Sequence, residues 1–303
     1  MKSKKSLNAS SESINIGNRF SNIREVWLKY KMNKNLFATS KKSKKTPIER
    51  ELERIARKEA RLTKQAVQYK TASWKENLEQ KIPPKVYTNL QSGFCKAFEL
   101  IFEKGTTLIE KTYSRDEMEL DFQVNDYAVD LKGGKKELQQ LKQGVDRGNL
   151  VNMAISTVEG IGLGALGIGL PDIVLFLSVI LKGTYETAVQ YGFSYDSPRE
   201  KLFILKLLET AMLKGDAWIA CNAETDSFFV PNGVWVETKF QEQVKRTADA
   251  FAVDMLLAKF VQGIPVAGIL GGISNPVYYR RILYYVQLKY QKRYLLQKSL
   301  SDF

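Results

Sequence analysis

Helical periodicity with a clear start signal constrains this chain more than any other feature of its sequence. Thr46-Pro47-Ile48-Glu49 places a capping residue first, a proline at the first helical position and a glutamate at the third. This is the pattern of a capping box. Apolar side chains then recur at spacings of four and three, at Ile48, Leu52, Ile55, Leu62, Ala66 and Tyr69. We therefore predict a long amphipathic helix that begins at Pro47 and reaches beyond Trp74.

The same periodicity returns in later parts of the chain. Residues 85–112 resume helical spacing after a Pro-Pro break, and Ser197-Pro198-Arg199-Glu200 is a second capping box. Further helices are expected over residues 237–262 and from about Pro276 to Lys298. The pattern predicts an all-α fold, a mainly helical multi-helix globular bundle.

Residues 216–236 are the stretch with the weakest helical pattern. Pro231-Asn232-Gly233 separates two apolar triplets there, which is consistent with a small β-hairpin near 228–236. An ordinary loop explains the same residues equally well.

A glycine-rich apolar segment over residues 151–193 predicts a helical hairpin. Five glycines, the last of them Gly169, lead into Leu170-Pro171-Asp172 and a second apolar run, Ile173–Leu181. Pro171 suits the first turn of a new helix, and Asp172 complements its dipole. A membrane span would have to cross both residues, and a central charge costs about 2.5–3.5 kcal/mol. Burial within the protein is the favoured interpretation, with a re-entrant membrane hairpin as the alternative.

Positive charge is concentrated at the N-terminal end. Residues 1–46 hold twelve Lys and Arg against two Glu, so +10 of the net charge of +13 lies there. We expect a basic, largely disordered arm over 1–46, a single helical domain over 47–298 and a tail over 299–303. Within the arm, one helical face and a lysine run are the predicted membrane-binding residues: Phe20, Ile23, Trp27, Tyr30, Lys41, Lys42, Lys44 and Lys45.

The chain has no histidine and only two cysteines, Cys95 and Cys221. Ser-His-Asp and Cys-His catalysis and histidine-ligated metals are therefore excluded. Two isolated thiols form no disulfide framework and no Cys-x-x-Cys zinc motif, which favours a reducing compartment. The basic N-terminus lacks the apolar core of a secretory signal. We predict no catalytic residue, no metal and no cofactor.

Four motifs in order resemble the EcsC family. They are Glu51-Leu52-Glu53-Arg54 with Trp74 and Ile82-Pro83, Gly169-Leu170-Pro171-Asp172, Tyr191-Gly192-Phe193 with Ser197-Pro198-Arg199-Glu200, and Ile264-Pro265-Val266-Ala267-Gly268 with Tyr279-Arg280-Arg281-Ile282 and Tyr290-Gln291-Lys292-Arg293. The resemblance spans about residues 48–297. It implies a bacterial, mainly helical protein from a family named for a product encoded beside an ABC-type transporter. The family-motif residues are Gly169, Pro171, Asp172, Pro265, Arg280 and Arg281.

Three functions remain open from the sequence. The favoured hypothesis is a non-enzymatic, cytoplasmic protein held at the inner face of the cell membrane by an anionic lipid surface, as an accessory to an ABC-type transporter. A hydrolase using Asp172 is the alternative, although capping or pairing with Arg280 or Arg281 also explains this carboxylate. Nucleic-acid binding by the arm rests on charge alone. The basic helix over 276–298 is either solvated or a second lipid-facing surface.

Overall fold

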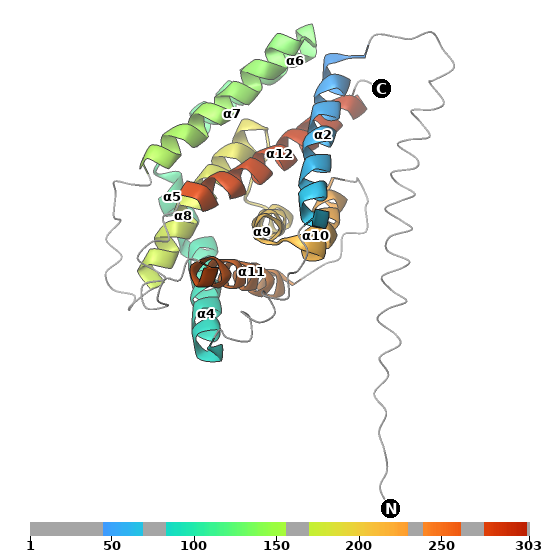
Figure 1. Ribbon diagram of the computed structural model, residues 1–303. Coiled ribbons are helices and arrows are strands. Elements are labelled where there is room, and N and C mark those ends of the chain that lie inside the picture. Colours follow the sequence, from blue (N-terminus) through green and yellow to red (C-terminus); the bar gives the residue numbers. More distant parts are fainter. Residues whose placement is uncertain (1–44, 69–82, 156–169, 230–238, 262–275, 302–303) are drawn as a thin grey trace, which may run out of the picture. The chain divides into compact units, whose positions relative to one another are not determined.

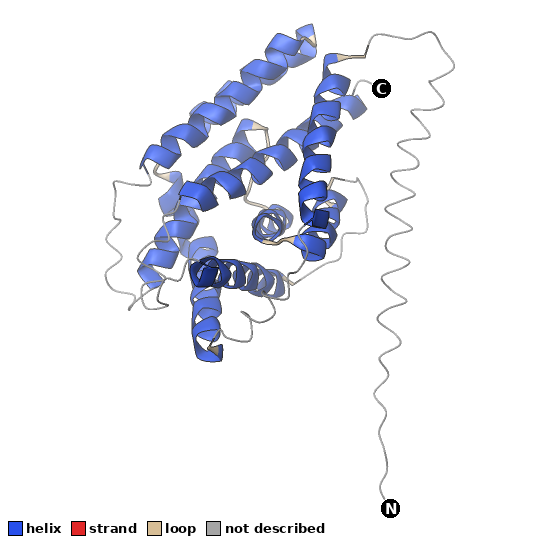
Figure 2. Ribbon diagram, in the orientation of Figure 1, coloured by secondary structure: helices blue, strands red, loops and turns tan. Residues whose placement is uncertain are grey.

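The computed structural model describes residues 45–68, 83–155, 170–229, 239–261 and 276–301. Helix is the regular structure throughout these ranges, and Figure 2 draws no strand in them. The predicted all-α class is therefore confirmed. The helices in chain order (Figure 1) are α2 (Pro47–Gln68), α4 (Pro84–Leu100), η1 (Ile101–Gly105), α5 (Thr106–Glu110), α6 (Arg115–Lys132), α7 (Lys135–Ile155), α8 (Leu170–Gln190), α9 (Pro198–Met212), α10 (Gly215–Ser227), α11 (Phe240–Val261) and α12 (Pro276–Ser301).

Both predicted capping residues begin a helix. At the start of α2, the Glu49 amide donates to Thr46 Oγ1 at 3.1 Å and the Thr46 amide donates to Glu49 Oε2 at 2.8 Å. At the start of α9, the Glu200 amide donates to Ser197 Oγ at 3.1 Å. The Glu200 carboxylate does not complete a box, because it accepts hydrogen bonds from two side chains of α12 instead. The glutamate side chain of the motif therefore completes the cap at the start of α2, whereas at the start of α9 it makes a tertiary contact with α12.

Aromatic side chains join α4, α8 and α11 in the core. Phe94 and Phe98 of α4 lie 5.3 Å and 5.8 Å from Phe251 of α11, measured between ring centroids. Phe176 of α8 lies 6.2 Å from the same ring. All four side chains are buried, and tilted and edge-to-face pairs of this kind add to the hydrophobic stabilisation of a core. The regular spacing of the apolar residues in each helix is what aligns them.

The apolar helix α8 belongs to this core. It begins at Leu170, so the helix start predicted at Pro171 is confirmed. The stretch Ile173–Gln190 is long and apolar enough to cross a membrane by length and composition, but 72% of it is buried inside the protein. That burial favours a core helix over a membrane span. The first arm of the predicted hairpin ends as α7 at Ile155, and residues 156–169 lie outside the described residues.

Two glycines allow close approach of the helices. A Cβ atom on Gly93 of α4 would meet the Ile173 side chain of α8 at 2.8 Å. Gly192 follows α8 with φ +79°, and a Cβ atom there would meet the Phe122 ring of α6 at 2.3 Å. Glycine fits both positions because it has no Cβ atom to clash, and at Gly192 it also adopts the positive φ without penalty.

Helices α6 and α7 form a hairpin, and both of its helices contact α8. Gly133 ends α6 with a left-handed φ of 54°, and its amide donates to the Val129 carbonyl at 2.7 Å. This is an αL helix ending, for which glycine is the preferred residue. The Gly133-Gly134 break seen in the sequence is therefore the turn of a helical hairpin.

The expectation that residues 216–236 are weakly helical is wrong for the first half of that stretch, which forms α10. Trp218, Cys221 and Thr225 recur at helical spacing and form the buried face of this helix. The exposed positions mix charged residues with alanines, so the helix has only a weak amphipathic pattern, and burial against α9 stabilises it. Most of the predicted β-hairpin, residues 230–236, lies outside the described residues.

Candidate functional site

The predicted membrane-binding residues fall mainly outside the described part of the chain. Only Lys45 lies within it, and Lys45 is exposed. The residues outside are Phe20, Ile23, Trp27, Tyr30, Lys41, Lys42 and Lys44. These seven positions therefore stay predictions.

Four of the six family-motif residues lie near the starts of two helices. Pro171 and Asp172 lie in the first turn of α8, whereas Gly169 and Pro265 lie outside the described residues. Arg280 is exposed on α12. Its neighbour, Arg281, has a carboxylate partner, Asp254, on α11.

Asp254 of α11 is the carboxylate that joins α12 to the loop before α10. Arg281 donates to Asp254 Oδ2 at 2.8 Å, and Lys214 Nζ lies 2.5 Å from Asp254 Oδ1. The side chain of Asp254 is 6% exposed. A buried carboxylate needs such partners, because an unpaired charge in this position would be strongly destabilising. Within the described chain, Arg281 therefore acts as a tertiary contact.

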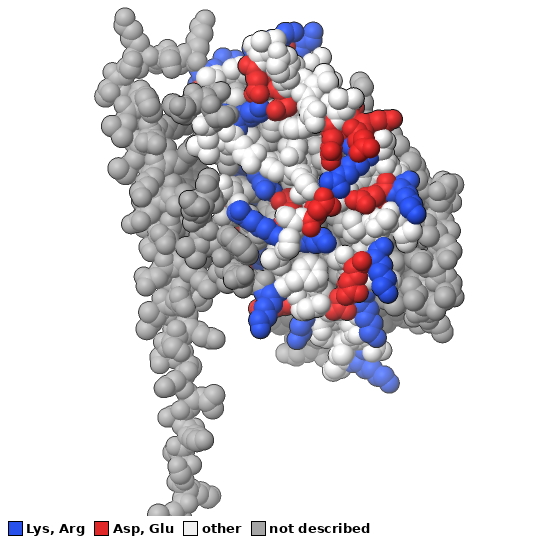
Figure 3. Space-filling model, turned by 180° about the vertical axis from the view of Figure 1, so that it is seen from behind, with Lys and Arg blue, Asp and Glu red and all other residues white. Residues whose placement is uncertain are grey.

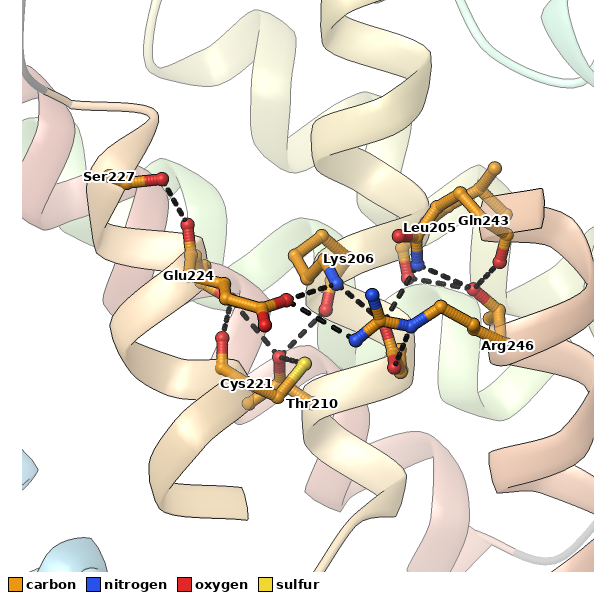
Figure 4. Close-up of polar contacts among 11 residues, drawn as sticks. Leu205, Lys206, Thr210, Cys221, Glu224, Ser227, Gln243 and Arg246 are labelled. Atoms are coloured by element: carbon orange, nitrogen blue, oxygen red, sulfur yellow. Dashed lines mark hydrogen bonds and ion pairs between the residues drawn. The ribbon is translucent and has the colours of Figure 1, made fainter. Parts of the chain in front are cut away.

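A buried polar cluster joins α9, α10 and α11 (Figure 4). We call it the Lys206 network: Lys206, Glu209, Glu224, Gln243 and Arg246. Lys206 Nζ donates to Glu209 Oε2 at 2.9 Å and to Glu224 Oε2 at 2.8 Å. Arg246 donates to the same two carboxylates at 3.1 Å and 3.3 Å, and the Gln243 amide donates to Glu209 at 2.8 Å. Each carboxylate therefore contacts two cations.

The Lys206 network is buried at one end and exposed to solvent at the other. The Lys206 and Glu209 side chains are each 5% exposed, whereas Glu224 and Arg246 are 45% and 40% exposed. Lys206 and Glu209 are three residues apart on α9, a spacing that places both on one helix face. The sequence thus sets the buried pair locally, and packing of α10 and α11 supplies the outer pair.

Both buried members of this network keep their ordinary charges. Burial alone would lower the pKa of Lys206, but the Glu209 and Glu224 carboxylates reverse the effect and leave the pKa raised. Burial alone would raise the pKa of Glu209, but Lys206, Gln243 and Arg246 leave the pKa lowered. A general acid or base works best with a pKa near the working pH. The pKa values of Lys206 and Glu209 are both shifted away from neutral pH, so the two side chains stay charged and form ion pairs.

Cys221 lies beside the Lys206 network without being an activated nucleophile. Its side chain is 2% exposed, and the Thr210 hydroxyl donates to its sulfur at 3.0 Å. Burial raises the pKa of the Cys221 thiol to about 12. Because the thiolate is the reactive form, this cysteine is a protonated core residue at neutral pH.

A second network joins α2, α10 and α12. We call it the Lys289 network: Lys289, Lys292, Glu59 and Asp226. Lys289, whose side chain is 0% exposed, donates to Glu59 at 2.7 Å and to Asp226 at 2.6 Å. Lys292 lies 2.9 Å from each of the same carboxylates. Burial alone would raise the pKa of Asp226, but the two lysines hold the pKa low, so the carboxylate stays ionised.

The remaining cations near the end of α12 have acidic partners from two further helices. Arg293 Nη1 donates to both carboxylate oxygens of Glu200 at 2.8 Å. Lys298 lies 2.8 Å from Asp126 and 2.5 Å from Asp130, both on α6. The hypothesis that α12 presents a second lipid-facing basic surface is therefore wrong for these cations. Their charges are matched by acids that only the tertiary fold brings near.

The described surface carries both signs of charge. Figure 3 shows Lys and Arg interspersed with Asp and Glu on one face, without a large area of a single sign. Among the described residues, no group of three or more His, Cys, Asp or Glu side chains is placed to hold a metal ion. The charged residues of the described body are thus arranged to connect helices to one another.

Fold and charge networks together define an all-helical protein whose helices are joined through buried ion pairs. The chain belongs to the EcsC protein family, because the family model matches residues 47–295. This match confirms the resemblance, and its first residue coincides with the start of α2. No curated protein and no solved structure matches the chain.

Proposed function

We propose that this EcsC-family protein is a non-enzymatic protein that associates with anionic membrane surfaces through residues 1–46. Charge separation along the chain is the observation that carries the proposal. The segment holds +10 of the net charge of +13, which leaves +3 for the other 257 residues. Within the described body, Lys289, Arg293 and Lys298 of α12 are paired with carboxylates. Attraction to an anionic surface therefore depends mainly on the arm.

The arm combines the two features that hold peripheral proteins on lipid. Phe20, Ile23, Trp27 and Tyr30 recur at spacings of three and four, which would place them on one face of a helix and suit insertion at the headgroup level. The lysines over residues 41–45 are each worth about 1 kcal/mol near an anionic leaflet. Such a protein would lie at the inner face of the cell membrane, where it could serve as an accessory to an ABC-type transporter, the partner that the family resemblance implies.

The non-enzymatic part of the proposal is supported by the ionisation states of the buried groups. The pKa of Lys206 is raised and that of Glu209 is lowered, whereas proton-transfer catalysts need the opposite shifts. The Cys221 thiol is held in its protonated form. These groups stabilise the fold, and the chemistry of the arm supplies the proposed activity.

Vesicle flotation of the full chain tests this function. We expect binding to vesicles of 30% phosphatidylserine and 70% phosphatidylcholine, and no binding to phosphatidylcholine alone. Replacement of Lys41, Lys42, Lys44 and Lys45 by glutamine should weaken binding at least tenfold, since four charges are removed. Raising the salt from 0.1 M to 0.5 M should also weaken it.

A matched control separates the arm from net charge. Replacement of four exposed body lysines by glutamine removes the same charge and should change vesicle binding at most twofold: Lys104, Lys111, Lys135 and Lys136. Equal losses in the two quadruple variants, or no flotation of the wild type, would overturn the proposal. Tighter binding to single-stranded RNA than to vesicles would transfer the arm's role to nucleic acid.

A further inference from the structure

Helix α6 presents a continuous apolar row to solvent. We call this row the outer stripe: Leu120, Val124, Tyr127 and Leu131. The four side chains are 59%, 62%, 68% and 67% exposed, and their spacing of four, three and four places them on one helix face. The opposite face, with Phe122 and Val129, packs into the core. Single exposed apolar residues are common, but a row of four on one face marks an interaction site.

Charge divides α6 and the turn that follows it into an acidic half and a basic end. The exposed acids of the first half are Asp116, Glu117 and Asp121. The exposed lysines of the other end are Lys132, Lys135 and Lys136. Within the described part of the chain, no ion pair joins any of these six side chains to another residue. The exposed Asp130, near the basic end, is paired with Lys298 at 2.5 Å. Both groups of charges can therefore contact a partner.

The outer stripe has the same spacing in both directions along the helix. A second α6 that runs the opposite way would therefore place Leu120 against the second copy's Leu131, and Val124 against the second copy's Tyr127. Leu120 and Tyr127 are seven residues apart, as are Val124 and Leu131, and this is the repeat of helices that pack side by side. The row is about 17 Å long, so two copies can pack along it over about three helical turns.

The charges select the antiparallel orientation. Two parallel copies would bring acidic half beside acidic half, and like charges across an interface disfavour association. Two antiparallel copies bring the acidic half of each beside the basic end of the other. In that register Asp121 lies within one turn of the second copy's Lys132 along the helix axis. The result is a closed two-fold dimer in which every contact is made twice.

Other occupants match the outer stripe less well. An anionic bilayer would be repelled by the exposed acids of the first half. A uniformly basic helix would meet the lysines of the other end. An extended strand would find no backbone partner, because the hydrogen bonds of a helix backbone are made within the helix. A second copy of this chain supplies the matching charge at both ends.

We propose that the outer stripe is a self-association surface, through which two copies of this chain pair by antiparallel packing of α6. Each copy contributes four apolar side chains, so the interface is below the standard size for a stable complex. We therefore expect a weak dimer, with a dissociation constant on the order of 100 μM. In dilute solution the chain is then a monomer, and the outer stripe does not contribute to its stability.

Sedimentation equilibrium of the full chain, from about 5 μM to about 300 μM, tests the association. We expect the average mass to rise from that of one chain toward that of two. Val124→Asp/Tyr127→Asp should weaken the dimer at least tenfold. The control Val67→Asp/Leu108→Asp alters two residues of similar exposure elsewhere on the body, 63% and 58%. The control should associate as the wild type does, within twofold.

Charge reversal tests the orientation. Glu117→Lys/Asp121→Lys makes the first half of α6 basic, and Lys132→Glu/Lys136→Glu makes the other end acidic. Each double variant should weaken the dimer at least tenfold, because like charges then meet across an antiparallel interface. The combination of all four substitutions should associate within threefold of the wild type, because opposite charges meet again. Circular dichroism should show equal helix content in all variants, which separates lost association from lost folding.

Several results would overturn the dimer. They are a monomer at every concentration, association that the outer-stripe variant leaves unchanged, an equal loss in the control, and assemblies larger than two copies, since a two-fold interface closes. Weakening by the single reversals without recovery in the combination would overturn the antiparallel pairing. Lipid is absent from all these measurements, so their outcome is independent of the function proposed above.

Discussion

Helices α12 and α6 are both rich in charge, but they use it in opposite ways. Helix α12 carries cations and no acid, and Lys289, Lys292 and Arg293 point into the body toward carboxylates of three other helices. Helix α6 carries mainly acids, and four of these and a row of apolar side chains are exposed to solvent. The basic helix α12 connects helices within the body, whereas the acidic helix α6 exposes charged and apolar side chains to solvent.

The difference shows that charge in a sequence does not by itself indicate exposure. Lys289 is as polar as any surface residue, yet it is fully buried, because Glu59 and Asp226 replace its water. Tyr127 and Leu131 are apolar and yet exposed. What decides the outcome is whether another helix supplies a partner.

The largest effect should follow from removing the cation at the centre of the Lys289 network. We expect Lys289→Met to lower the free energy of unfolding by about 3 kcal/mol, because two carboxylates lose their buried partner. Urea denaturation measures it, with Arg280→Met on the exposed face of the same helix as the control. A loss below about 1 kcal/mol would mean that Lys292 alone satisfies both acids.

Glu209→Gln should have the next largest effect, about 2 kcal/mol, because Lys206 loses one of its two ion-pair partners. The substitution also changes the response to acid. The pKa of Glu209 is lowered from its ordinary value of 4.5, so its stabilisation is complete above that pH and is lost as the pH falls through the lower folded-state value. Stability measured between pH 6 and pH 3 should therefore fall less steeply in the variant. Parallel curves for both proteins would contradict this assignment.

A smaller effect is expected for the hydroxyl of Tyr290. This group is buried and donates to Glu200 at 2.7 Å, while Arg293 also binds the carboxylate. Tyr290→Phe should lower the free energy of unfolding by about 1–2 kcal/mol, the range for a hydrogen bond to a charged group. Tyr284→Phe, at a half-exposed tyrosine of the same helix, should leave thermal unfolding unchanged. Equal shifts in the two variants would show that the Glu200 contact contributes little.

The smallest effect should come from the exposed apolar row of α6, the outer stripe, which consists of Leu120, Val124, Tyr127 and Leu131. Val124→Ser/Tyr127→Ser alters two side chains that are each more than 60% exposed, so stability should stay within about 0.5 kcal/mol of the wild type. Calorimetry compares it with Phe122→Ser on the inner face of α6, which should be clearly destabilised because that ring packs on Tyr294. A large loss at the outer stripe would end the contrast between the two helices.

Local signals in the sequence were sufficient to predict much of the fold. Thr46 and Ser197 begin helices as predicted, and the apolar spacing identified the core faces of α2 and α4. These features involve residues at most a few positions apart, so the sequence displays them directly. The error at α10 has the opposite origin, because its helix depends on burial of Trp218 and Cys221 against the rest of the body.

The charge networks could not be predicted in the same way. Glu59 and Lys289 are 230 residues apart, and Glu200 and Arg293 are 93 apart. Neither pairing follows from spacing, because any of several acids could have met each cation. The buried pair Lys206 and Glu209 did leave a signal, because the two charges lie three residues apart within the mainly apolar stretch 202–212 of α9. A charged pair at that spacing within apolar residues indicates buried ion pairs.

The contact between Glu59 and Lys289 also sets an order of events during biosynthesis. Ribosomes add about 5–20 residues per second, so Glu59 is made on the order of 10 to 50 s before the lysine 230 positions later. Until α12 emerges, α2 and α10 present carboxylates without their cations, and α12 then completes both contacts. Nascent chains that end before α12 should therefore be preferred substrates of cellular proteases.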